Sequence, residues 1–178
     1  MEMKNIEALK REAGDTAFYN EATYGGCAQA VLGAIKKVTG NKISDDVFKA
    51  ATGLAGGIGN SGNTCGAITG GVMAMGIFRG REYSNMEDPE KIQIDTHRMV
   101  IELINRFMEE YGGVTCKEIQ TKIMGRSFNF WSEQDMEDFL KMGGHGDRCP
   151  SVCCKSAQWV VDILQKNGYL DLECSNRV

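Results

Sequence analysis

Residues 53–80 read GLAGGIGNSGNTCGAITGGVMAMGIFRG, a segment in which glycine recurs throughout. Its first part, 53–64, holds too many glycines for a regular element, so it predicts a loop with several residues at positive φ. Its second part, 65–78, has helical spacing, with one side formed by Cys65, Thr69, Val72 and Gly76. Each glycine inside a helix costs about 1 kcal/mol relative to alanine. We therefore expect the backbone of this helix to approach a neighbour or a cofactor closely.

The sequence on both sides of this segment predicts further helices. The chain has only two prolines and few alternating β-branched runs, which argues against strands. Capping residues and apolar spacing predict helices over 4–12, 27–38, 45–54, 89–111, 116–124, 133–142 and 150–167. An aromatic connector, 125–131, joins two of them. The prediction is an all-α fold, a single-domain bundle of about six to eight helices with a glycine-rich loop, in which 1–20 and 169–178 are peripheral.

Composition excludes several classes of protein. The 178 residues suit one domain, and the net charge of −4 gives no basic surface for nucleic acid or an anionic membrane. No apolar run approaches the roughly 20 residues of a membrane span, and the charged N-terminus lacks the apolar region of a signal peptide. The seven cysteines are an odd number, which is typical of a reducing compartment rather than of a disulfide framework. We expect a cytoplasmic protein.

Four cysteines, Cys27, Cys65, Cys116 and Cys149, lie at or within one residue of an expected helix start. Helix N-termini carry free N–H groups and partial positive charge, which stabilise anions and lower the pKa of a thiol. If the four helix starts face one another, their thiolates could bind a metal or an iron–sulfur cluster. The separations (27 to 65, 65 to 116, 116 to 149) contain no short CxxC pair, however, and apolar helical faces also suit buried structural cysteines.

The remaining three cysteines allow other arrangements. Cys153 and Cys154 are close enough to Cys149 to replace it, and Cys174 lies in the tail. His145, Cys149 and Cys153 are spaced by four, so a helix extended backward would align them as zinc ligands. Glycine and proline within this stretch argue against that helix.

Four segments in order resemble a known family: YGGCAQAVLGA (24–34), GLAGGIGNSGNTCGAITGGVMAMG (53–76), GGVTC (112–116) and RCP (148–150). Together they are similar to the redox-active proteins named for a C…CGAxxG…C…C pattern, over about residues 20–167. Similar sequence occurs in a domain of split-Soret cytochrome c, which carries an iron–sulfur centre besides haem. This chain has no CxxCH motif, so a shared role would involve cluster or thiol chemistry without haem.

The resemblance implies that the family's four cysteines are Cys27, Cys65, Cys116 and Cys149. We therefore expect a small redox protein that binds an iron–sulfur cluster through them and transfers electrons to a partner protein. In the glycine-rich segment, Gly57 and Gly66 would allow backbone N–H groups to approach the cofactor. The alternatives are a metal-free thiol–disulfide oxidoreductase and a structural zinc module held by the same cysteines. A homodimer is also expected, because the glycine-rich helix and the aromatic connector could both pack against a second copy.

Overall fold

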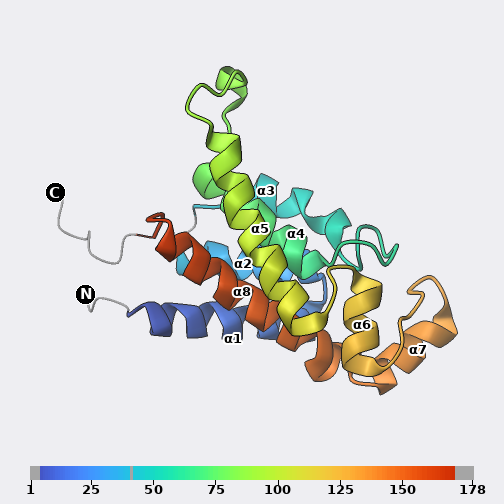
Figure 1. The fold of residues 1–178 in the computed structure, drawn as a ribbon. Helices are drawn as coiled ribbons and strands as arrows, with labels where there is room; N and C mark the ends of the chain where they lie inside the picture. The colour runs from blue at the N-terminus through green and yellow to red at the C-terminus, as the bar shows by residue number, and fades with distance from the viewer. Residues whose placement is uncertain (1–4, 41, 171–178) are drawn as a thin grey trace.

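The computed structural model describes residues 5–40 and 42–170, and in them it has eight α-helices and no strand (Figure 1). The α-helices are α1 (Ile6–Tyr24), α2 (Cys27–Val38), α3 (Asp45–Ala50), α4 (Gly66–Arg79), α5 (Ile92–Tyr111), α6 (Cys116–Met124), α7 (Glu133–Lys141) and α8 (Cys149–Lys166). The all-α prediction is confirmed, including its single domain and its number of helices. No helix among the described residues is long and apolar enough to cross a membrane.

Helices α1, α2, α4, α5 and α8 form the main bundle, in which α1 lies along α8 (Figure 1). The sequence predicted a short, peripheral helix over 4–12, and this is wrong for the described residues. Helix α1 continues to Tyr24 and buries Leu9, Ala13 and Ala17 in the core. These small side chains allow α8 to pack closely, since a Cβ at Gly14 would lie within 3.0 Å of side-chain atoms of Cys154 and Gln158. Small residues gave little apolar signal in the sequence, which is why the length was missed.

Helix α4 crosses α2 at close range, as its glycines predicted. A Cβ at Gly70 would lie 3.0 Å from the Ala28 backbone carbon atoms and nearer still to the Ala28 carbonyl oxygen. The buried face of α4 differs from the predicted stripe, because Thr69, Val72 and Gly76 are only partly buried. The buried residues of α4 are Gly66, Ala67, Ile68, Gly70, Gly71, Ala74 and Met75. The glycines themselves therefore form much of the packed face.

Two helix starts differ from the sequence prediction. Helix α5 begins at Ile92 rather than Pro89, yet the Asp88 carboxylate still caps it, accepting from the N–H groups of Ile92 (2.7 Å) and Gln93 (2.9 Å). Residues 143–147 were expected to be a loop. Instead, residues Gly144–Arg148 form a π-helix that runs directly into α8. The predicted start of α6 at Cys116 is confirmed, and Thr115 and Glu118 exchange hydrogen bonds there in a capping box.

Helices α6 and α7 lie at one end of the bundle and have a second, smaller core (Figure 1). The predicted aromatic connector supplies Phe128 and Phe130, whose rings pack edge-on against Phe139 of α7 at 5.5 and 4.9 Å. Both features behind the homodimer expectation are thus used within one chain, and the homodimer stays a prediction.

Candidate functional site

Five cysteines line one small cavity, and they come from α2, α6, α8 and the residue that precedes α4. The lining consists of Cys27, Cys65, Ala67, Cys116, Ile119, Gln120, Cys149, Val152 and Cys153. The four cysteines predicted from the sequence are therefore brought together, as is Cys153, which the sequence analysis left outside the set. All five are free thiols. The open space between them is about 20 Å³, which is on the order of one water molecule.

Two loops that lie far apart in the sequence position Cys65 and Cys116. Thr64 and Thr115 form an isolated antiparallel bridge, and each immediately precedes one of the cysteines. The Cys65 N–H donates to the Val114 carbonyl at 2.9 Å, and the Cys116 N–H donates to the Asn63 carbonyl at 2.6 Å. The bridge thus holds the starts of α4 and α6 side by side. These hydrogen bonds fix the backbone positions from which both thiols project into the cavity.

Cys27 lies at the start of α2, against the backbone of α4. A Cβ at Gly66 would overlap the Cys27 Sγ and lie 3.1 Å from the Ala28 nitrogen, so only glycine fits there. Hydrogen bonding from the backbone of Gly56 and Ala28 lowers the pKa of the Cys27 thiol, and that of Ala67 and Ile68 lowers the pKa of the Cys65 thiol. The glycine-rich loop and two helix starts therefore lie beside these thiols, whereas the approach of their N–H groups to a cofactor stays a prediction.

Gly57 has a different structural role from Gly66. It has φ +77°, and a Cβ there would lie 2.5 Å from the Asn63 nitrogen and 2.6 Å from the Asn63 oxygen. Gly57 therefore lets the loop fold back onto the strand-like residues that lead to Cys65. Its place beside a cofactor stays a prediction.

Helix α8 contributes Cys149 and Cys153, which are one turn apart on the same face. The Cys149 N–H donates to the Gly144 carbonyl of the π-helix, so α8 lacks the free N-terminus that was expected at this cysteine. The Cys153 Sγ lies 3.9 Å from the Cys27 carbonyl oxygen, which links α8 to the start of α2. Cys154 is turned away from the cavity toward Gly14 of α1. Cys174 lies outside the described residues.

Burial makes these thiols hard to ionise, contrary to the expectation that helix starts would lower their pKa values. Burial raises the pKa of Cys65 to about 12, and negative charge on Cys116 adds to the effect. Burial raises the pKa of Cys116 to about 12 as well, with contributions from Cys27 and Glu21. The pKa values of Cys27, Cys149 and Cys153 are also raised, first by burial. The backbone donors lower the pKa values of Cys27 and Cys65, but they do not offset the loss of water.

Two buried polar side chains near the thiols were missed in the sequence. Glu21 of α1 is 3% exposed, and its negative charge raises the pKa of all five cavity cysteines. Its Oε1 lies 3.3 Å from the His145 Nδ1, whereas its Oε2 has no hydrogen-bond partner within residues 5–40 and 42–170. Gln120 of α6 is 2% exposed, and its Nε2 also lacks a partner in this part of the chain. The sequence did contain a signal for Glu21, because it follows Ala17 by four residues and so lies on the face that α1 buries.

The sequence offered a second possible zinc site, formed by His145, Cys149 and Cys153. The π-helix continues α8 backward, so these three residues do lie on one continuous helical segment. The His145 ring, however, packs edge-on against Phe139 at 5.1 Å and faces Glu21. Across residues 5–40 and 42–170, no group of three or more His, Cys, Asp or Glu side chains is arranged so that it could hold a metal ion. Binding a metal would thus require the thiols to adjust their positions.

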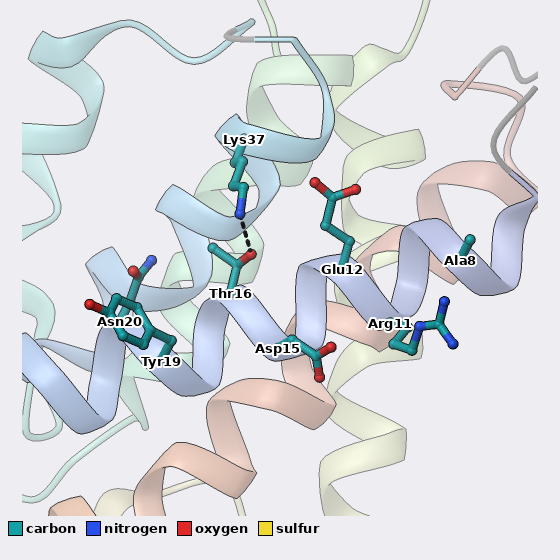
Figure 2. Close-up of a pocket in the computed structure, with 8 residues that line it drawn as sticks. All are labelled: Ala8, Arg11, Glu12, Asp15, Thr16, Tyr19, Asn20 and Lys37. Atoms are coloured by element: carbon teal, nitrogen blue, oxygen red, sulfur yellow. Dashed lines mark hydrogen bonds between the residues drawn. The ribbon is translucent and has the colours of Figure 1, made fainter. Parts of the chain in front are cut away.

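A separate groove on the surface lies over α1 and α2 (Figure 2). The residues that line it have mostly polar side chains and include no cysteine: Ala8, Arg11, Glu12, Asp15, Thr16, Tyr19, Asn20 and Lys37. Figure 2 shows Lys37 reaching from α2 to the Thr16 hydroxyl, at 3.2 Å. The groove and the cysteine-lined cavity share no residue.

Comparison with known proteins agrees with the cysteine pattern. The chain is 26% identical to an uncharacterized protein of Archaeoglobus fulgidus over 123 residues, which cover 66% of this chain and 78% of the relative. No solved structure gives a significant match. Residues 26–163, which include all five cavity cysteines, match a family model. The chain belongs to this family, described as "Putative redox-active protein (C_GCAxxG_C_C)".

Proposed function

We propose that this chain is an electron-transfer protein that binds an iron–sulfur cluster through Cys27, Cys65, Cys116 and Cys149. The observation that carries the proposal is that these four cysteines, dispersed over most of the chain, line one cavity. Four thiolates are the usual ligand set of [2Fe–2S] and [4Fe–4S] clusters. When bound, such a cluster supplies a one-electron redox couple, which agrees with the redox-active description of the family.

The chemistry of the lining fits such a group. N–H donors near cluster sulfurs and an apolar shell are the protein features that tune a cluster. Here the start of α2 and the start of α4 provide N–H donors at the Cys27 and Cys65 sulfurs, and Ile119 and Val152 provide apolar lining. The thiols must lose their protons when they become ligands, and bound metal cations stabilise the thiolate form that burial otherwise disfavours.

A second candidate is a single zinc ion on the same cysteines. The volume of about 20 Å³ favours it, because one ion would require less movement of the four helix starts than a cluster. In this candidate the cysteines would hold the bundle together, and the protein would have no redox activity of its own.

A thiol–disulfide oxidoreductase is a weaker alternative. Its attacking cysteine must be ionised near neutral pH, and reactive thiols of this kind have pKa values of about 3.5–7.5. The pKa of about 12 at both Cys65 and Cys116 opposes that mechanism. Both side chains are also buried, which limits access to a second protein.

One anaerobic preparation tests these functions together, by visible spectrum and by iron, sulfide and zinc content. We expect a brown protein with equal iron and sulfide, a Cys65→Ser variant that loses both, and a Cys154→Ser variant that keeps both. Cys154 is the matched control because it lies on α8 next to Cys153 but outside the cavity lining. A colourless protein with one zinc per chain would favour the second candidate. Full iron content in both variants would refute the ligand assignment.

A further inference from the structure

Gln120 of α6 is a buried amide in the wall of the cysteine-lined cavity. Its Oε1 accepts a hydrogen bond from the Phe128 N–H at 3.0 Å, which fixes the orientation of the amide group. The Nε2 at the other end is buried and has no hydrogen-bond partner among the described residues. A buried donor that is left unsatisfied destabilises the fold, because it has lost its hydrogen bonds to water. Such a group in the lining of a cavity points to a ligand that accepts the missing hydrogen bond.

The position of Gln120 on α6 brings it to the Cys116 side of the cavity. The two residues are four apart, so they lie on one face of the helix, and a long side chain leans toward the turn before it. Both line the cavity.

We propose that Gln120 donates a hydrogen bond through Nε2 to a sulfur of the bound group on its Cys116 side and thereby raises the group's reduction potential. The proposal rests on the proposed function. Reduction by an external one-electron donor adds one electron to the group and breaks no bond at Gln120. The added negative charge strengthens the hydrogen bond, so the amide stabilises the reduced form more than the oxidised form. Gln120 is a positioning residue and is not a ligand.

The test is a reduction potential measured on the cluster-loaded protein and two variants. Gln120→Glu keeps an oxygen that can accept from the Phe128 N–H, but it replaces the amide donor with a negative charge. Gln120→Leu removes the donor without adding charge, so it separates the hydrogen bond from a simple charge effect. We expect the ratio of reduced to oxidised protein at a fixed potential to fall about tenfold in Gln120→Leu, which is about 59 mV for one electron. The fall in Gln120→Glu should be larger.

Gln134→Glu is the matched control, because it makes the same substitution on the exposed surface of α7, where the amide bonds only to Asp138 at 3.0 Å. Its potential should equal that of the wild type. An unchanged potential in a Gln120→Leu protein with full iron and sulfide would refute the role of Gln120 alone. Loss of the cluster from both Gln120 variants would also refute it, because the residue would then be needed for assembly rather than for tuning. A wild type that holds no cluster after reconstitution would refute the proposed function, and the role of Gln120 with it.

Discussion

Gly70→Ala tests the close crossing of α2 and α4, which places Cys27 and Cys65 at one cavity. A Cβ at Gly70 would lie 3.0 Å from two backbone carbons of Ala28 and nearer still to its carbonyl oxygen. An ordinary contact is 3.4 Å or more. The atoms that the new Cβ would meet belong to the Ala28 backbone, and a Cβ itself cannot rotate away. Neither helix can therefore relieve the overlap by rotating a side chain. The two helices must move apart, and the packing around the crossing must loosen.

The matched control is Gly76→Ala, two turns along the same helix. A Cβ at Gly76 would meet nothing within 4 Å, and Gly76 has no positive φ. Both substitutions gain helix propensity, about 1 kcal/mol, so the difference between the two variants isolates the steric cost. Overpacking costs about 1–3 kcal/mol. We expect the free energy of unfolding to rise by up to about 1 kcal/mol in Gly76→Ala. In Gly70→Ala the overpacking outweighs the same gain, so we expect a fall of up to about 2 kcal/mol.

The assay is urea unfolding of the reduced, metal-free proteins in one buffer, followed by far-ultraviolet circular dichroism. Comparing m-values as well as midpoints checks that the unfolding transition is the same in each protein. If Gly70→Ala is as stable as Gly76→Ala, the α2–α4 contact is looser than described here, and the argument that glycines allow the crossing is wrong.

Three further predictions concern the thiols. The free energy of unfolding of the reduced, metal-free protein should fall as pH rises from about 9 toward 12. The reason is that thiols of the unfolded chain ionise near pH 9, while Cys65 and Cys116 stay protonated to about pH 12 in the folded protein. Unfolding curves measured at several pH values would give a constant free energy over this range if burial has no such effect. Gly66→Ala should displace the Cys27 sulfur and lower iron and sulfide content several-fold, measured beside Gly76→Ala, which should match the wild type. Glu21→Gln should move the pH midpoint of cobalt(II) uptake downward, because a negative charge that raises the thiol pKa values is removed; an unchanged midpoint would contradict this influence.

The sequence predicted the elements of this fold better than their extents. Caps at Ser44, Thr115 and Ser132 are confirmed, since each side chain accepts the expected backbone hydrogen bond. The length of α1 was missed because the residues that it buries after Leu9 are alanine, glycine and a glutamate, which carry little apolar periodicity. The π-helix was missed because Gly146 and Pro150 read as helix breakers. Pro150, however, lies in the first turn of α8, where its missing N–H is tolerated.

The cavity itself shows why the candidate site could be predicted only in part. Placing cysteines at helix starts identified Cys27, Cys65, Cys116 and Cys149, but nothing local in the sequence shows that Thr64 pairs with Thr115. Helical spacing could have indicated two further lining residues, Cys153 and Gln120. Cys153 follows Cys149 by four residues, and Gln120 follows Cys116 by four. Those pairs become informative only when the first member of each is assigned to a cavity.

The same cavity explains why its cysteines can be so widely dispersed. A CxxC pair sets two sulfurs close together through local backbone geometry, whereas here each sulfur depends on a packed helix start. Cys27 is held by the α2–α4 crossing at Gly66 and Gly70, and Cys65 is held to Cys116 by the threonine bridge. Site geometry and core packing are therefore one property of this chain, and a substitution that loosens the bundle should also change how well the thiols hold a ligand. The Gly70→Ala protein should accordingly lose part of its iron and sulfide along with its stability, whereas Gly76→Ala should retain both.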